Sequence, residues 1–222
     1  MQITQIRTHI VGEARNSLFV VVDTDEGIYG LGEEGITWRE AAVAGFIDAL
    51  RPALIGQDPR RIEHLWQVMF RCGFFPANRI GAAAISAIDI ALWDLKGIAT
   101  GKPVYELLGG PVSESVQVYA SALHPVGHDK VQDEARAYVA EGYRSMKMRF
   151  PYGPGDGEKG MDENEAHIAN AREAVGPDID LMADAYMGWN LEYATKMCKR
   201  LEPYGLAWVE EPLIPDDLDG YA

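Results

Sequence analysis

The sequence predicts an α+β capping domain followed by an incomplete (β/α) barrel of the TIM type, with about four of the eight βα units. Three observations support this architecture. Strand patterns precede helix patterns in residues 1–111. In residues 112–222 strand and helix patterns alternate at a spacing of about 30 residues, as βαβ units require. Two of these later strands end abruptly in acidic residues.

Composition limits the class of protein. The 222 residues are 47% hydrophobic and 24% charged, which is typical of a globular chain. A net charge of −14 argues against nucleic acid and membranes as partners. No apolar run is long enough to cross a membrane, no signal-peptide pattern opens the chain, and the only cysteines are Cys72 and Cys198. We therefore expect a cytoplasmic protein with two buried free thiols.

The capping domain, residues 1–111, is predicted to open with an antiparallel meander. Residues 3–10 alternate apolar and polar side chains, and residues 18–23 form a second strand. The turn Asp25-Glu26-Gly27 leads into a third strand at residues 28–33, so the last two strands form a hairpin. Three helices follow, at residues 38–50 after the cap Thr37, at residues 60–70 after Asp58-Pro59, and at residues 80–100 before Gly101.

The second domain, residues 112–222, is predicted to be the first half of the barrel. Its strands are predicted at residues 116–120, 145–148, 180–184 and 207–210. Its helices are predicted at residues 129–141, 162–175 and 191–202. This alternation indicates a parallel sheet with helical crossovers. Because a complete barrel takes about 250 residues, we expect the chain to be the N-terminal part of a longer protein or one half of a split protein.

Acidic residues end two neighbouring strands of this sheet. The runs Leu181-Met182-Ala183-Asp184 and Ala207-Trp208-Val209-Glu210 end in a carboxylate, at the edge where (β/α) barrels keep their chemistry. Carboxylates that converge repel each other unless a cation lies between them. Oxygen ligands without His or Cys select a hard ion, so we predict a Mg²⁺ site. Because Glu210 and Glu211 point to opposite sides of a strand, only one of them can face this site.

A longer motif relates the chain to a known family. The runs AISAIDIALWDLKG (residues 84–97) and GKPVYELLGG (residues 101–110) resemble the signature that closes the capping domain in the mandelate racemase/muconate lactonizing enzyme branch of the enolase superfamily. In that family the signature is structural: small side chains allow close helix packing, and Asp89 and Asp94 make local bonds. The resemblance covers the whole chain. Residues 153–160 and 184–190 are most similar to sugar-acid dehydratases of the rhamnonate type.

This resemblance implies a reaction and a set of catalytic residues. Members abstract the proton next to a carboxylate and stabilise the resulting enediolate with Mg²⁺. Asp184 and Glu210 match the first two metal ligands, and Lys147 matches the first Lys of the family's Lys-x-Lys. Arg149 stands where relatives carry a second Lys that can be the base. Because Arg is not deprotonated in proteins, we expect Arg149 to bind substrate and Lys147 to act electrostatically, unless the two form a solvated strand end.

Four further residues are candidates for substrate binding. Tyr186 stands where many relatives carry Asn, and together with Trp189 it either lines the pocket or packs as a buried aromatic. Arg15 and Trp38 lie in capping-domain loops that correspond to substrate-closing loops of relatives, although lone loop charges are often solvated. His124 follows the first barrel strand and so lies on the edge that can touch substrate.

The predicted function is Mg²⁺-dependent dehydration of a sugar acid, by α-proton abstraction and loss of the β-hydroxyl, to give a 2-keto-3-deoxy acid. One alternative is a racemase or epimerase of a hydroxy acid. An alternative of another class is a non-catalytic fragment that needs a C-terminal half to assemble. By resemblance, the third metal ligand and the general base lie beyond Ala222. We expect the full-length protein to form homo-oligomers, or this chain to associate with the missing half.

Overall fold

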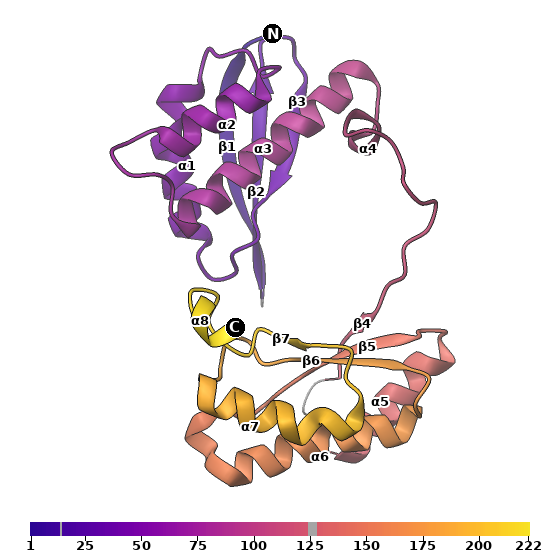
Figure 1. The fold of residues 1–222 in the computed structure, drawn as a ribbon. Coiled ribbons are helices and arrows are strands. Elements are labelled where there is room, and N and C mark those ends of the chain that lie inside the picture. The colour runs from indigo at the N-terminus through magenta and orange to yellow at the C-terminus, as the bar shows by residue number, and fades with distance from the viewer. Residues whose placement is uncertain (14, 124–127) are drawn as a thin grey trace. The chain divides into compact units, whose positions relative to one another are not determined.

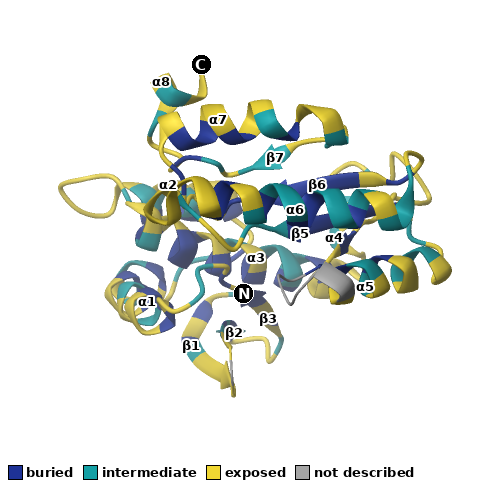
Figure 2. Cartoon of the chain, turned by 90° about the horizontal axis from the view of Figure 1, so that it is seen from below, coloured by how far each residue is buried: buried dark blue, intermediate teal, exposed yellow. Residues whose placement is uncertain are grey.

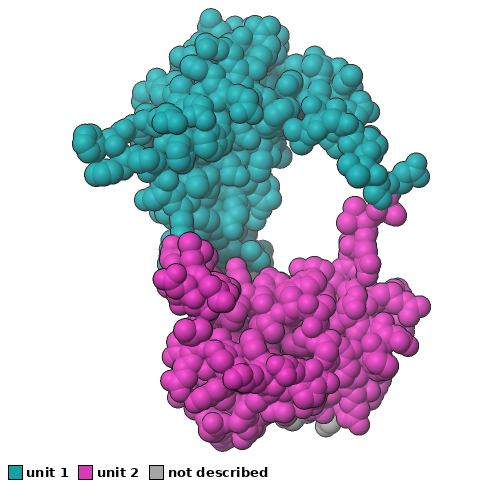
Figure 3. Space-filling view, in the orientation of Figure 1, with its two compact units in different colours: residues 1–114 teal, residues 115–222 magenta. Residues whose placement is uncertain are grey.

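The computed structural model describes residues 1–13, 15–123 and 128–222 of the chain. These residues divide into two compact units, Met1–Glu114 and Ser115–Ala222 (Figure 3). Each unit buries a hydrophobic core of its own.

The first unit contains the predicted antiparallel meander. Its strands β1 (Ile3–Gly12), β2 (Asn16–Thr24) and β3 (Tyr29–Glu33) pair in the order β1-β2-β3 (Figure 1). Burial alternates along β3, and in β2 the alternate residues Leu18, Val20 and Val22 are fully covered, because successive side chains point to opposite faces. The predicted meander, including the hairpin between its last two strands, is confirmed.

Helices cover one face of this sheet (Figure 1). They are α1 (Glu40–Leu54), α2 (Ile62–Arg71) and α3 (Arg79–Thr100). The short α4 (Val104–Leu107) follows α3 and contributes no buried residue. α1 begins later than predicted and is not capped by Thr37, because Trp38 has a φ of +63°, outside the helical region. α3 is capped by Asn78, whose side chain accepts the N–H of Gly81 at 3.0 Å, and it ends at Gly101 as predicted.

Strand β3 lies very close to α3. A Cβ atom at Gly32 would collide with the carbonyl oxygen of Ala87. The Oδ2 atom of Asp94 accepts the backbone N–H of Leu31 at 2.8 Å, which ties the middle of α3 to β3. The small residues of the signature therefore serve close packing. The expectation that Asp94 bonds locally is wrong, because this hydrogen bond joins positions 63 residues apart.

Gly32→Ala is expected to destabilise the first unit by about 3 kcal/mol, because a methyl group against helix backbone forces β3 and α3 apart. Chemical denaturation followed by circular dichroism measures the change. Gly45→Ala is the matched control, since Gly45 lies in α1 with open space at its Cβ position. This control should be more stable than the wild type by roughly 1 kcal/mol. Equal unfolding free energies for the two variants would contradict the packing described.

The second unit contains a parallel sheet, as predicted. Its strands pair in the order β4 (Ala120–Ser121), β5 (Ser145–Arg149), β6 (Asp180–Asp184) and β7 (Val209–Glu210). The helices of this unit are α5 (His128–Ala140), α6 (Gly157–Val175), α7 (Leu191–Leu201) and the short α8 (Leu218–Tyr221). The edge strands β4 and β7 are shorter than predicted, because only two residues of each pair in register with the neighbouring strand. Helix α6 begins earlier than predicted, directly after the turn Pro154–Asp156.

The two faces of the parallel sheet differ. Met146 and Met148 of β5 point into the core covered by α5, α6 and α7 (Figures 1 and 2). The alternate positions Lys147 and Arg149 therefore belong to the opposite face. Helices α5, α6 and α7 lie on the first of these faces (Figure 1), and the charged strand ends do not belong to the apolar core there.

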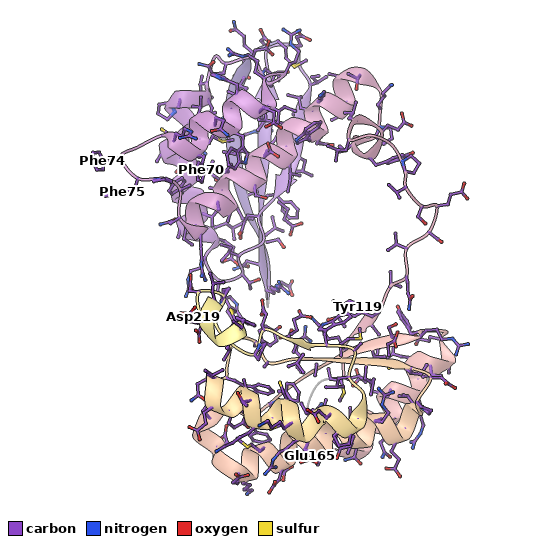
Figure 4. All side chains as sticks on the ribbon, viewed as in Figure 1. Phe70, Phe74, Phe75, Tyr119, Glu165 and Asp219 are labelled. Carbon is purple, nitrogen blue, oxygen red and sulfur yellow. The ribbon has the colours of Figure 1, made fainter. Side chains whose placement is uncertain are left out.

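Some surface features bear on the sequence predictions. No helix among the described residues is both long and apolar enough to cross a membrane. Cys72 and Cys198 are exposed free thiols, which corrects the expectation that they are buried. Cys72 follows the last residue of α2, in the loop from which Phe74 and Phe75 project outwards (Figure 4).

Candidate active site

Four charged side chains meet at the carboxyl edge of the parallel sheet. Lys147 and Arg149 end β5, Asp184 ends β6 and Glu210 ends β7. The strand register places Arg149 beside Asp184, and Asp184 beside Glu210. Because residues in register on parallel strands point to the same face, all four side chains belong to the face opposite the helices.

The ammonium of Lys147 joins the two carboxylates. Its Nζ atom lies 2.5 Å from Glu210 Oε1 and 3.3 Å from Asp184 Oδ2. The side chains of Lys147 and Asp184 are 8% and 6% exposed, and that of Glu210 is 32% exposed. Burial lowers the pKa of Lys147, but its hydrogen bonds to Glu210 and Asp184 together outweigh this and raise the pKa above 10.5. Lys147 is therefore an ammonium at neutral pH, and its hydrogen bond lowers the pKa of Glu210.

The second oxygen of each carboxylate is held by a neighbouring donor. The backbone N–H of Tyr186 donates to Asp184 Oδ1 at 2.9 Å. The indole N–H of Trp208 donates to Glu210 Oε2 at 3.1 Å. Both carboxylates thus keep one oxygen toward the ammonium and one toward a neutral N–H donor, which orients them.

Two aromatic residues of this cluster, Tyr119 and Trp208, were not predicted. Their rings meet edge to face with centroids 5.9 Å apart, and Lys147 Nζ lies 5.8 Å from the Tyr119 centroid. Trp208 lies two residues before Glu210, so the two-residue period of a strand could have identified it. Tyr119 precedes β4 in a segment without strand pairing, and its position carries no such signal.

The guanidinium of Arg149 forms no ion pair with a carboxylate of residues 1–13, 15–123 or 128–222. Within the part of the chain that the structure describes, its Nε atom is buried without a hydrogen-bond partner. Its Cζ atom lies 5.4 Å from the ring centroid of Tyr186. Because a buried donor without a partner costs about 1–3 kcal/mol, this arrangement suits an anionic ligand that satisfies the guanidinium.

Tyr186 lies in a strained loop after β6. Tyr186 and Met187 have φ values of +53° and +58°, which residues other than Gly rarely adopt. The loop is held in place because the N–H of Met187 donates to the carbonyl of Glu211 at 2.7 Å. Backbone strain of this kind persists only where the surroundings enforce it, and it is common at functional sites. Tyr186 is 58% exposed and can form a pocket wall, whereas Trp189 is 5% exposed and serves packing.

The two carboxylates suit a hard divalent ion. Asp184 Oδ2 and Glu210 Oε1 face the same ammonium, so they converge on one point, and both donors are oxygen. Over residues 1–13, 15–123 and 128–222, no group of three His, Cys, Asp or Glu side chains is placed to hold a metal. The described residues therefore offer two protein ligands. Mg²⁺ accepts such a set because it usually keeps several water ligands.

The remaining predicted site residues are Arg15, Trp38 and His124. Arg15 donates from Nη2 to Thr37 Oγ1 at 2.8 Å and lines a recess of 780 Å³ in the first unit. Trp38, also in the first unit, is 76% exposed. His124 lies outside the described residues. Substrate contacts by these three side chains stay predictions.

Comparisons with known proteins match both units. The family model described as mandelate racemase / muconate lactonizing enzyme, N-terminal domain, matches residues 3–109. The model described as enolase C-terminal domain-like matches residues 130–222.

Individual relatives show the extent of the similarity. A D-galactonate dehydratase of Ralstonia pickettii (strain 12J) is 36% identical over 227 aligned positions, which cover 100% of this chain and 58% of the relative. A provisionally named L-rhamnonate dehydratase of Caldivirga maquilingensis is 38% identical, over 90% of this chain and 48% of the relative. The structure of a racemase from Streptomyces coelicolor A3(2) with bound magnesium is 34% identical, with a TM-score of 0.85, over 98% of this chain and 65% of that chain. The chain thus spans less than two thirds of each of these proteins.

Proposed function

This chain belongs to the mandelate racemase/muconate lactonizing enzyme family of the enolase superfamily, and we propose that it carries part of the active site of a Mg²⁺-dependent sugar-acid dehydratase. Its first unit is the capping domain of that family, and its second unit is a segment of the parallel α/β barrel. In this proposal the four strands of the second unit supply half of an eight-stranded barrel. The observation that carries the proposal is the meeting of Lys147, Asp184 and Glu210 at one strand edge.

Arg149 and Lys147 have different roles toward the substrate carboxylate. Arg149 binds the carboxylate, or a hydroxyl next to it, through its guanidinium, whose buried Nε atom has no hydrogen-bond partner among the described residues. Tyr186 stacks on that guanidinium and limits where the substrate lies. Lys147 is a fixed ammonium that stabilises the negative charge developing as the α-proton leaves. Because Arg stays protonated and the pKa of Lys147 is raised, the base that removes the α-proton is a different residue.

The chemistry of dehydration follows from this charge stabilisation. A Mg²⁺ ion held by Asp184 and Glu210 supplies Lewis-acid stabilisation of the substrate carboxylate when it is bound. After the α-proton leaves, the electron pair on the α-carbon forms a double bond to the β-carbon. The β C–O bond breaks, and the hydroxyl takes up a proton and departs as water. The enol that remains tautomerises to a 2-keto-3-deoxy acid, while Arg149 and Lys147 hold the carboxylate throughout.

Turnover of a panel of sugar acids by the full-length protein tests the proposal. D-Galactonate and L-rhamnonate are the first substrates to try, because two relatives carry these names. We expect a product lighter than the substrate by one water, with solvent deuterium at the carbon that loses the hydroxyl. The recovered substrate should keep its configuration. A panel without any dehydrated product would contradict the proposal.

A second candidate is racemisation or epimerisation of a hydroxy acid at the same site. The similarity to a racemase with bound magnesium favours it. This reaction needs bases on both faces of the α-carbon and no loss of the β-hydroxyl. The measurement that favours this activity over dehydration is substrate with inverted configuration and solvent deuterium at the α-carbon, formed without loss of water.

The activity of the 222-residue chain by itself needs a separate test, because this chain spans 58% of the D-galactonate dehydratase of R. pickettii. A non-catalytic module that functions only after assembly with a further barrel half remains the alternative for this chain. Calorimetric titration with Mg²⁺ distinguishes a chain with a working metal site from a non-catalytic module. We expect binding at millimolar Mg²⁺ through Asp184 and Glu210, and absence of binding at that concentration would favour the non-catalytic module.

Arg149→Lys is expected to lower kcat/KM about 100-fold in the full-length protein, mainly by raising KM. Lys keeps the charge but loses the two-pronged hydrogen-bond geometry and the stacking on Tyr186. Steady-state kinetics on the sugar acid that is turned over measures the change. Arg136→Lys is the control, since Arg136 lies exposed on α5 in an ion pair with Asp133 at 3.2 Å. An unchanged KM for Arg149→Lys would exclude the proposed role of Arg149.

A further inference from the structure

A buried polar side chain of α6 binds the loop that follows β5. Asn164 is fully buried. Its Nδ2 atom donates to the carbonyl of Tyr152 at 3.0 Å, and the N–H of Tyr152 donates to Asn164 Oδ1 at 3.3 Å. The indole N–H of Trp189, from the loop before α7, donates to the same carbonyl at 3.0 Å. Three hydrogen bonds from two elements thus fix the backbone of Tyr152.

The loops after β5 and β6 are in direct contact. The N–H of Phe150 donates to the carbonyl of Asp184 at 3.0 Å. The ring centroids of Phe150 and Trp189 lie 4.7 Å apart. A Cβ atom at Gly153 would lie 3.2 Å from the carbonyl oxygen of Gly188, so the two backbones approach closely there. These contacts span the loop from its first residue to Gly153.

The same loops carry the functional side chains. Phe150 directly follows Arg149, and Trp189 lies a few residues after Tyr186. Among the residues that the structure describes, the Nε atom of the Arg149 side chain is buried without a hydrogen-bond partner. The place of its guanidinium therefore depends on the backbone that carries it and on the Tyr186 ring.

We propose that Asn164 and Trp189 are positioning residues, which act through the peptide groups of Tyr152 to hold the Arg149 loop against the Asp184–Tyr186 loop. Neither residue belongs to the four charged side chains at the strand edge. Their effect on turnover rests on the proposed function, whereas their effect on the two loops does not. Supporting groups of this kind typically change activity by about 10- to 100-fold when they are removed.

Two variants remove the support and two serve as controls. Asn164→Leu removes both hydrogen bonds of that side chain to Tyr152, and Trp189→Phe removes only the indole N–H while it keeps a ring against Phe150. Tyr193→Phe is the first control, because the Tyr193 hydroxyl accepts from Asn164 Nδ2 at 3.3 Å and forms no hydrogen bond to Tyr152 in the described part of the chain. Ile168→Val is the second, because Ile168 is buried on α6 and its shortening lowers stability without removing a polar contact.

Hydrogen–deuterium exchange measures the effect of the variants on the two loops and does not depend on catalytic activity. In Asn164→Leu and Trp189→Phe we expect the amides of residues 150–153 and 185–189 to exchange roughly 10-fold faster than in the wild type, because local opening becomes easier. Tyr193→Phe and Ile168→Val should leave these amides unchanged. Unchanged exchange in both support variants would overturn the proposal, and Trp189→Phe provides this test even where Asn164→Leu fails to fold.

Steady-state kinetics of the full-length protein measures the effect on the site. Asn164→Leu and Trp189→Phe should raise KM for the sugar acid about 10-fold, with a smaller change in kcat. Ile168→Val should lower the unfolding midpoint and leave KM unchanged. If KM rose in every variant, Ile168→Val included, as the unfolding midpoint fell, Asn164 and Trp189 would have only a structural role and the proposal would be overturned. A wild type without turnover would contradict the proposed function, and the exchange result would still decide the positioning role.

Discussion

Asp184→Asn is expected to weaken Mg²⁺ binding by roughly 100-fold or more and to lower turnover about 10³-fold in the full-length protein. The amide has the size of the carboxylate and still accepts the N–H of Tyr186, but it carries no charge. Of the two carboxylates paired with Lys147, Glu210 is then the one that keeps its negative charge. Calorimetric titration with Mg²⁺ and initial rates on the sugar acid measure the two effects.

A carboxylate on the same strand provides the matched control for this variant. Asp180 stands at the amino end of β6, is exposed, and accepts the hydroxyl of Ser145 at 3.5 Å. Asp180→Asn should therefore leave Mg²⁺ affinity unchanged. If Asp184→Asn bound Mg²⁺ as tightly as this control, Asp184 would not be a ligand, and the proposed activity would lose its main support.

Lys147→Met is expected to lower the free energy of unfolding by about 3 kcal/mol, because two converging carboxylates lose the ammonium they share. Chemical denaturation in the presence of a chelator measures this loss. Lys196→Met is the control, since Lys196 forms an exposed pair with Glu192 on α7 at 2.8 Å. Removal of that exposed pair should cost much less, because solvent screens the two charges. Equal losses in the two variants would show that the buried ammonium is not a structural counter-charge.

Mg²⁺ should restore part of the stability lost in Lys147→Met. At a concentration 100 times its dissociation constant, a ligand that binds only the folded state stabilises it by about 2.7 kcal/mol. At the same Mg²⁺ concentration, the unfolding free energy of the wild type should rise less than that of the variant, because the Lys147 ammonium repels the ion from Asp184 and Glu210. A larger gain in the wild type than in the variant would contradict a shared ion at these carboxylates.

The stabilisation by Lys147 should also depend on pH. The ion pair lowers the pKa of Glu210 below 4.5, so its contribution is complete above pH 4.5 and is lost as the pH falls through the lowered value. The pKa of Lys147 is raised above 10.5, so its contribution is complete below pH 10.5 and is lost as the pH rises through the raised value. The stability difference between wild type and Lys147→Met should therefore be constant near neutral pH and shrink in acid. Unfolding free energies at pH 7 and pH 3 measure this, and an equal difference at both would contradict the ion pair.

Much of the fold could be predicted because the patterns that specify it are local. The two-residue alternation at residues 3–10 and the turn at Asp25-Glu26-Gly27 predict the meander, since side-chain direction in a strand has a period of two. The alternation of strands and helices after residue 112 predicts the parallel sheet. Element ends were less predictable. The positive φ of Trp38, which delays α1, depends on a backbone conformation that the pattern around Thr37 does not reveal.

The candidate site was predictable to a similar extent. Acids and cations that end neighbouring parallel strands must share one edge, and the structure brings Lys147, Asp184 and Glu210 together there. The sequence alone did not indicate that Lys147 bridges both carboxylates, because that contact depends on the distance between strands and on side-chain conformation. It also did not single out Asn164, whose function depends on a peptide group from another element.

The sequence by itself determined which elements form, in what order, and which edge of the parallel sheet carries the charged groups. Periodicity and chain direction are properties of short segments, and they survive in any packing of those segments. Only the tertiary structure decided which groups are paired: Asp94 with Leu31 across 63 residues, and Trp189 with Tyr152 across 37 residues. It also decided that Lys147 pairs with two carboxylates, while the Nε atom of Arg149 is buried without a hydrogen-bond partner in the described part of the chain. Hydrogen bonds and ion pairs require separations of a few ångströms, and only the packing of distant segments sets such distances.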